Sequence, residues 1–355
     1  MMNNFLMQGG PKKIAARFIL LYGLIFLLLS FIYPDVFTII VSTMAIVLII
    51  DPIVEVLMKL RGMVRMFAII MALLIFFLSI LSLIVLLAPS VIEQAGNFYN
   101  FMVNFFENKQ WEGYFSKYPD IQKSVSDILI KIQPKFLDFV ANAISNITKM
   151  TPQIISFLFY VILGSIYLAF YFPEFKRKIG IIFPRIARRE ALDFLRETYL
   201  QLRQFVISLF LVALIVGISF GVFLLFIGVK YSLLLGVWAA ITNLIPIVGV
   251  VLEIIPLLLT GVSMGLKAVV TIAIAVAVVH TTAFVIFLKL MKGYIKINPV
   301  VMIFMILLST QIFGMIGAFI AVPLTIVIRL YWQYFIYPWL EGKKLDKVEK
   351  NGEEK

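Results

Sequence analysis

The amino-acid sequence predicts an all-α, polytopic membrane protein with about six spanning helices and two re-entrant helical hairpins arranged as an inverted repeat. Three observations support this fold class. Of the 355 residues, 62% are hydrophobic and 14% are charged, a composition too apolar for a soluble domain. Runs of about 18 or more apolar residues recur, each long enough to cross a bilayer as a helix. Two long runs are interrupted in the same way, at 243–249 and at 311–317.

The composition also excludes several kinds of site. The chain has no cysteine and one histidine, which rules out disulfides, thiolate nucleophiles and most metal clusters. We expect no metal and no cofactor. The net charge of +12 is attributed to cytoplasmic loops, where Lys and Arg collect, rather than to a nucleic-acid partner.

Four spans are predicted in the first half of the chain, at 14–33, 36–50, 67–88 and 152–172. The basic residues Lys12, Lys13 and Arg17, which precede the apolar stretch beginning at Phe18, are typical of a signal peptide. No small-residue cleavage site follows, so we expect the span to be retained. The third span is expected to end at Pro89.

Three connecting segments of the first half differ in composition. Residues 51–66 and 173–204 are rich in Lys and Arg and are placed in the cytoplasm, the second as a basic amphipathic helix. Residues 90–150 carry both charges, with apolar positions three and four apart, and are placed outside as amphipathic helices. Together, residues 1–204 are predicted to form a membrane scaffold that makes oligomer contacts.

The second half, 205–333, does not fit straight spans. Two of its four apolar runs, 231–264 and 299–333, have 34 and 35 residues, whereas a bilayer needs about 20. Straight spans would also put Lys289, Lys292 and Lys296 outside, against the usual cytoplasmic excess of basic residues.

Re-entrant hairpins remove both difficulties. If 231–264 and 299–333 each break near mid-membrane and return, the three lysines lie in the cytoplasm. A span and a hairpin, 205–264, are then followed by a second span and hairpin that enter from the opposite face, which is an inverted repeat. Both termini are cytoplasmic, and 334–355 form a charged tail.

The two breaks are predicted to bind substrate, because irregular backbone at membrane depth survives only when buried or lining a wet cavity. Helix N-termini and side-chain amides there can hold a polar ligand. The alternative is that both are kinked helices with packing glycines. The candidate substrate-binding residues are Asn243, Pro246, Gly249, Gln311, Gly314 and Gly317.

Three further residues are candidates for ion coupling. Glu253 is the only acidic residue between 198 and 340, and carboxylates at such depth usually face a cavity or a partner. It could carry a proton, bind sodium, pair with Lys230 or Lys267, or lie at the membrane interface. His280 could relay protons or form a helix–helix hydrogen bond. Thr310 is the third candidate for ion coupling.

Enzymatic activity is not expected. The Gly-x-Ser-x-Gly sequence at 261–265 needs a strand–turn–helix context and a catalytic triad to act as a nucleophile. The Gly-x-x-x-Gly sequence at 217–221 indicates helix packing. No phosphate-binding Walker A sequence occurs, and we name no catalytic residue.

The sequence resembles the autoinducer-2 exporter family, the PerM-like permeases of bacteria and archaea. The resemblance is carried by "GVKYSLLLGVWAAITNLIPIVGVVLEIIP", by "INPVVMIFMILLSTQIFGMIGAFIAVPLTIVIRL" and by "DPIVEVLMKLRGMVRMFAI". The family motif positions correspond here to Pro246, Gly249, Gly314, Gly317 and Pro323. His280 with Thr282, and Glu253, are departures from the family pattern.

The resemblance implies a transporter of the cell membrane that exports small polar molecules, with an elevator-like transport part and a homo-oligomeric, pentameric assembly. We therefore expect a secondary transporter for an autoinducer-2-like solute, with 205–333 as its mobile part. One alternative is a sodium (cation)/proton antiporter that uses Glu253, since some family members are proposed to exchange these ions. A second is a membrane scaffold without transport.

Overall fold

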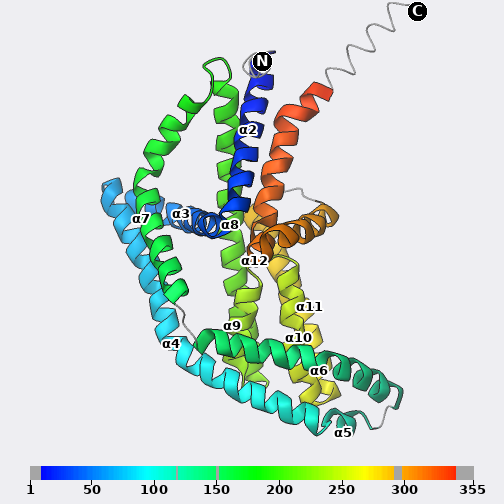
Figure 1. The fold of residues 1–355 in the computed structure, drawn as a ribbon. Coiled ribbons are helices and arrows are strands. Elements are labelled where there is room, and N and C mark those ends of the chain that lie inside the picture. Colours follow the sequence, from blue (N-terminus) through cyan, green and yellow to red (C-terminus); the bar gives the residue numbers. More distant parts are fainter. Residues whose placement is uncertain (1–8, 117–118, 149–151, 292–297, 341–355) are drawn as a thin grey trace, which may run out of the picture. The chain divides into compact units, whose positions relative to one another are not determined.

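The computed structural model describes residues 9–116, 119–148, 152–291 and 298–340, and no β-strand occurs among them (Figure 1). Seven helices in this part of the chain are long and apolar enough to cross a membrane. Six of them overlap the six predicted spans over most of their length. The seventh, Ile316–Leu340, includes the second arm of the second predicted hairpin. The all-helical, multi-spanning class is confirmed, with one more candidate span than expected.

The chain forms two compact units that are interleaved in sequence. Unit 1 contains Met1–Leu73, Leu158–Ile207 and Gly293–Lys355, and unit 2 contains Leu74–Phe157 and Ser208–Lys292. The expected boundary at residue 204 falls within one of three long helices that run from one unit into the other. The assignment of a scaffold and a mobile part remains a prediction.

The described helices of unit 1 begin at prolines in several cases, because a proline at the first helical position costs no hydrogen bond. Pro11, Pro34 and Pro299 begin three of its helices. The elements are α2 (Pro11–Ile32), α3 (Pro34–Arg61), the start of α4 (Arg65–Glu107), the end of α7 (Pro152–Lys178), η1 (Ile179–Ile182), the start of α8 (Arg188–Phe226), α12 (Pro299–Tyr331) and η2 (Trp332–Ile336).

A cluster of charged side chains joins three helices of unit 1. Asp51 of α3 is 8% exposed and accepts a hydrogen bond from the hydroxyl of Tyr199 on α8. Its carboxylate lies 3.8 Å from Arg65 of α4 and 3.7 Å from Arg203 of α8. Arg203 also pairs with Glu55 at 2.9 Å. The basic segment 51–66 is therefore mostly helical and is tied to α8.

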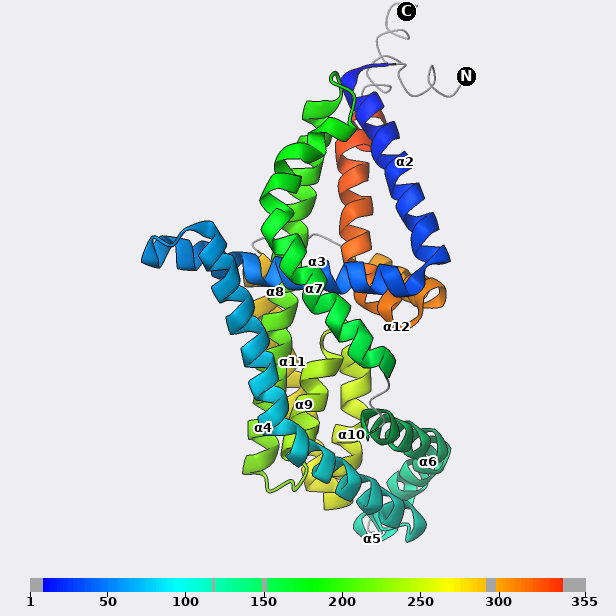
Figure 2. The ribbon, with the colours of Figure 1, turned by 60° about the vertical axis from the view of Figure 1, so that its left-hand side comes forward.

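Unit 2 contains the rest of α4, α7 and α8 together with α5 (Trp111–Phe115), α6 (Pro119–Thr148), α9 (Ser232–Thr242), α10 (Val248–Met264) and α11 (Leu266–Met291). The amphipathic α6 packs on its neighbours. Its residues Leu129 and Phe136 share a core cluster with Phe98 of α4, Trp111 of α5 and Leu259 of α10. Figure 2 shows α9 and α10 running side by side.

Two helix ends differ from the prediction. Helix α4 continues through Pro89 to Glu107, because a proline removes only one backbone hydrogen bond from a long helix. At the other end, helical structure continues through η2 to Leu340, beyond the expected start of the tail at residue 334. Residues 341–355 lie outside the described residues.

Close packing of α8 on α9 confirms the role expected for the Gly-x-x-x-Gly sequence. A β-carbon placed on Gly217 would lie 2.5 Å from the β-carbon of Ala240 and 2.8 Å from the carbonyl oxygen of Gly236. Side chains at these positions would force the helices apart. Within unit 2, α9 therefore packs directly against α8.

Candidate functional site: two helix breaks and a buried carboxylate

The first break lies in unit 2, between the end of α9 at Thr242 and the start of α10 at Val248. The intervening turn is held by local hydrogen bonds, from Ile245 N–H to Thr242 O at 2.9 Å and from Gly249 N–H to Ile245 O at 2.8 Å. Ile247 has φ of 67°, a conformation that a β-branched residue adopts only under constraint. The predicted break is therefore present.

The two helices on either side of this break fold back against one another. The indole N–H of Trp238 on α9 donates to the carbonyl oxygen of Leu252 on α10 at 3.1 Å. Closer to the turn, Gly249 approaches Thr242 so closely that a β-carbon would overlap the Thr242 carbonyl oxygen. Glycine is required because only its missing side chain permits this approach.

Glu253 is the centre of a buried polar cluster beside the break. It is 0% exposed, and it lies in the second turn of α10. The side-chain amide of Asn243, the residue that ends α9, donates to Oε2 of Glu253. Nε2 of His280 on α11 lies 3.2 Å from Oε1. Each carboxylate oxygen therefore has a polar partner from a different element.

The environment of this cluster sets its electrostatics. The ring of Phe220 on α8 packs against His280 with 5.9 Å between centroids, and the His280 side chain is 19% exposed. Burying an unpaired carboxylate is costly, and partners that donate hydrogen bonds or carry positive charge offset that cost. His280 is therefore a partly exposed partner of a carboxylate that is itself fully buried.

This arrangement excludes two of the alternatives that the sequence left open for Glu253, and the roles in proton or sodium binding stay predictions. Its polar partners among the described residues are Asn243 and His280, not Lys230 or Lys267. Complete burial also contradicts a position at the membrane interface. For His280, the structure confirms a helix–helix hydrogen bond between α11 and α10.

The second break lies in unit 1, inside α12. Gly314 has φ of 61° and ψ of −144°, outside the helical region, and separates two helical arms. A β-carbon on Gly317 would overlap the carbonyl oxygen of Ser309, so these arms also fold back on one another. In a continuous helix, residues eight apart would be about 12 Å distant along the axis. The ring of Phe313 packs on Phe37 of α3.

The candidate residues fall into two groups. Asn243, Glu253 and His280 come together at the first break, with Pro246 in its turn and Gly249 at the start of α10. The remaining candidates, Gln311, Gly314, Gly317 and Thr310, belong to the second break in unit 1. Gln311 and Thr310 are exposed, and the Thr310 hydroxyl donates to Ile306 O at 2.6 Å.

Three residues near the breaks were not expected from the sequence. Trp238 joins the two arms of the first break. Oε1 of Gln94 on α4 accepts a hydrogen bond from the backbone N–H of Leu234 at 3.0 Å and so caps α9. Ser309 is 1% exposed, and its hydroxyl has no hydrogen-bond partner among the described residues. A single tryptophan within an apolar helix was a visible signal. The partners of Gln94 and Ser309 depend on tertiary contacts that carry no sequence pattern.

Comparison with known proteins agrees with the resemblance seen in the sequence. The profile of the AI-2E family transporter matches residues 18–335. A protein of Thermotoga maritima named "Putative transport protein" is 36% identical over 325 residues, which are 92% of this chain and 96% of that protein. A Bacillus subtilis protein named "Putative transport protein YrrI" is 26% identical over 226 residues, 62% of each chain. The chain belongs to the AI-2E family of transporters.

Proposed function

We propose that this chain is a secondary transporter that couples proton binding at Glu253 to the movement of a small polar solute across the cell membrane. The observation that carries the proposal is the complete burial of Glu253 between Asn243 of the first break and His280 of α11. Ionisable residues inside membrane helices are rare and are found mainly on ion and substrate pathways.

The contacts of Glu253 suggest how protonation would act on the protein. The carboxylate accepts a hydrogen bond from the amide that ends α9. Protonation removes its charge, weakens that charge-assisted bond, and so changes the stability of the turn. Proton binding and the shape of the break are thereby linked through one side chain.

The first break also offers groups for a polar solute. Among the described residues, the backbone N–H groups of Ile247 and Val250 have no backbone acceptor. They lie at the start of α10, where the helix dipole adds partial positive charge. Donors of this kind at a broken helix are a common way for transporters to bind polar substrates.

The similarity of the two breaks supports an inverted repeat with re-entrant hairpins. Each break has a glycine, Gly249 or Gly317, packed on a carbonyl oxygen of the preceding arm. On this proposal 205–333 moves against a scaffold of 1–204 in an elevator-like cycle. A homo-oligomer, a pentamer by family resemblance, would hold the scaffold in place. The exported solute would be of the autoinducer-2 kind, again by family resemblance.

A second candidate function is a sodium (cation)/proton antiporter. It is favoured by the contact between Glu253 and His280, because a buried carboxylate–imidazole pair can exchange a proton with a competing cation. The two candidates share the role of Glu253 and differ in what moves against the proton.

Proteoliposomes holding the full chain and a pH-sensitive dye test the proposal. An imposed gradient of autoinducer-2, or of sodium in a separate arm, should move protons through the wild-type protein. Glu253→Gln keeps the shape and can still accept a hydrogen bond from Asn243, but it cannot exchange a proton, so the proton flux should fall to background. The matched control Glu93→Gln, on an exposed residue of α4 in the same unit, should keep wild-type flux.

The experiments with the solute gradient and with the sodium gradient distinguish the two candidate functions, and one outcome contradicts both. Flux driven only by sodium supports the antiporter, and flux driven by the solute supports the coupled exporter. Proton flux that is equal in wild type and Glu253→Gln would overturn the assigned role of Glu253.

A further inference from the structure

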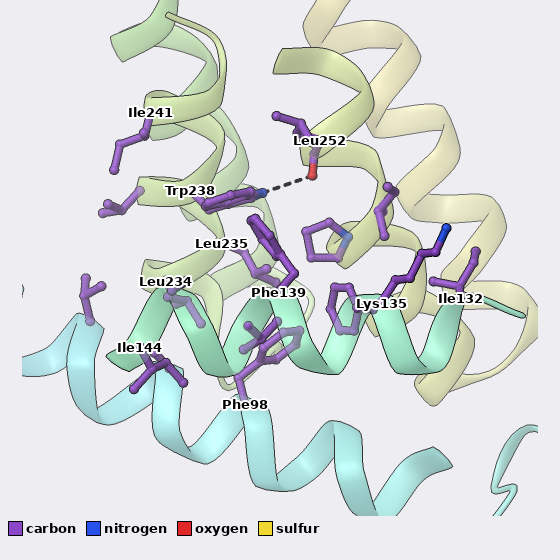
Figure 3. A pocket seen from close by; sticks show the side chains of 18 of the residues that line it. Phe98, Ile132, Lys135, Phe139, Ile144, Leu234, Leu235, Trp238, Ile241 and Leu252 are labelled. Carbon is purple, nitrogen blue, oxygen red and sulfur yellow. Dashed lines mark hydrogen bonds between the residues drawn. The ribbon is translucent and has the colours of Figure 1, made fainter. Parts of the chain in front are cut away.

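An apolar cavity of about 560 Å³ lies within unit 2, away from the polar cluster. Its walls come from α4, α6, α9 and α10 (Figure 3). The volume is in the range of sites that bind small organic ligands. Because the walls include both arms of the first break, whatever occupies the cavity touches the arms directly.

The lining has one dominant chemistry and one exception. Phe98, Phe136, Phe139 and Trp238 supply aromatic surface, and aliphatic side chains supply most of the rest. Figure 3 shows Phe139 of α6 next to Trp238 of α9, with 5.5 Å between ring centroids. A sugar or another uncharged polar solute would find few hydrogen-bonding partners in such a space.

The exception is a pair of lysines. Lys131 and Lys135 both line the cavity from α6, four residues apart and therefore on one face of the helix. Both are exposed. Neither has a carboxylate within ion-pair distance among the described residues, and no Asp or Glu lines the cavity. Two unpaired positive charges therefore border an apolar space.

We propose that this cavity binds an acyl chain of an anionic phospholipid from the surrounding bilayer, with the lipid phosphate held by Lys131 and Lys135. The ligand needs a long apolar part to fill the space and an anionic group to pair with the lysines, and an anionic membrane lipid supplies both. The inference does not depend on the proposed transport activity.

The bound chain would brace the first break. Trp238 lines the cavity and donates to the carbonyl oxygen of Leu252, which precedes Glu253 in α10. An acyl chain against Trp238 and Leu252 would hold the arms in the observed arrangement. Lipid binding is then a means of controlling the break through residues that are not part of the polar cluster.

Native mass spectrometry of the full chain, stripped of lipid in a mild detergent, tests the proposal. Phosphatidylglycerol and phosphatidylcholine with identical acyl chains are added in equal amounts. The wild-type chain should retain one phosphatidylglycerol, with at least a several-fold preference over phosphatidylcholine. The double variant Lys131→Gln/Lys135→Gln should lose the preference, whereas Lys123→Gln, an exposed lysine of α6 outside the cavity, should keep it.

A second pair of variants tests the cavity itself. Ala143→Leu places a larger side chain inside the cavity and so fills part of it, whereas Asn142→Leu places the same side chain at the neighbouring exposed position. The first should lose the retained lipid, and the second should keep it. Equal retention of the two lipids by the wild type, displacement of phosphatidylglycerol by an equal amount of oleate, or unchanged retention in a folded Ala143→Leu variant would each overturn the proposal. If Ala143→Leu does not fold, the exposed lysine variants decide alone.

Discussion

Asn243 and His280 differ in what they contribute to Glu253. Asn243 also donates to Ala239 O at 2.8 Å, so one amide both ends α9 and satisfies the carboxylate on α10. His280 reaches the same carboxylate from α11. At the residue scale, the site is therefore one acidic group that joins three elements of unit 2.

Replacing Asn243 tests the structural part of this role. Asn243→Ala leaves Oε2 of Glu253 without its donor in a fully buried position, which should lower the free energy of unfolding by roughly 1–3 kcal/mol. Thermal unfolding in detergent measures the change. Asn142→Ala, on an exposed residue of α6, should leave the midpoint unchanged, and equal midpoints for both variants would contradict the buried contact.

The charged cluster of unit 1 gives a second prediction at this scale. Tyr199→Phe removes the hydroxyl that donates to the buried Asp51, and a hydrogen bond to a charged group contributes about 1.5–3 kcal/mol. The thermal midpoint should fall accordingly. Tyr167→Phe, on a side chain that is 60% exposed, is the control. A Tyr199→Phe variant as stable as this control would argue against the cluster.

At the scale of elements, the two breaks show that different residues can produce the same geometry. The positive φ value falls on Ile247 in the first break and on Gly314 in the second. In both, the glycine that permits close approach of the arms comes later, at Gly249 and Gly317. Both breaks need space for a carbonyl oxygen beside the glycine, whereas the turn between the arms differs between them.

Alanine substitution tests that requirement. Gly249→Ala and Gly317→Ala would each place a methyl group on a backbone carbonyl oxygen, so we expect a loss of about 3 kcal/mol or more, from forced movement of the arms. Unfolding in detergent and transport assays measure the effect. Gly96→Ala, in α4 with open space at its β-carbon, should be neutral or gain up to about 1 kcal/mol. If Gly249→Ala and Gly317→Ala were as stable as Gly96→Ala, that result would contradict the close approach of the arms.

At the scale of the whole molecule, the chain passes several times between its two units. Helices α4, α7 and α8 each begin in one unit and continue into the other. The first break belongs to unit 2 and the second to unit 1. The orientation of these breaks in the membrane depends on which loops are cytoplasmic.

Labelling of single cysteines tests the orientation, since the chain has no native cysteine. Lys292, which lies outside the described residues, is predicted to be cytoplasmic, and Lys123 on α6 to be external. Lys292→Cys should react with a membrane-impermeant thiol reagent only after lysis, whereas Lys123→Cys should react in intact cells. Labelling of Lys292→Cys from outside would mean straight spans and would remove the basis for re-entrant hairpins.

Much of the helical architecture could be predicted because membrane helices are encoded locally. An apolar run of sufficient length forms a helix whatever its neighbours are, since lipid cannot satisfy backbone hydrogen bonds. This is why each of the six expected spans largely coincides with an observed helix, and why both breaks lie where proline or glycine interrupts the run. Helix lengths were less predictable, as at Pro89, because neighbouring contacts decide whether a helix continues.

Composition and the pattern of apolar runs were enough to predict the class of the protein, the position of the breaks and the identity of Glu253 and His280 as unusual polar residues in an apolar chain. Packing between helices decided that these two residues meet, with Asn243 as the third partner, and that Lys230 and Lys267 take no part. It also decided that α6 closes an apolar cavity against α9 and α10. The physical reason is that burial and pairing depend on contacts between residues far apart in the chain, and these leave no periodic signal in the sequence.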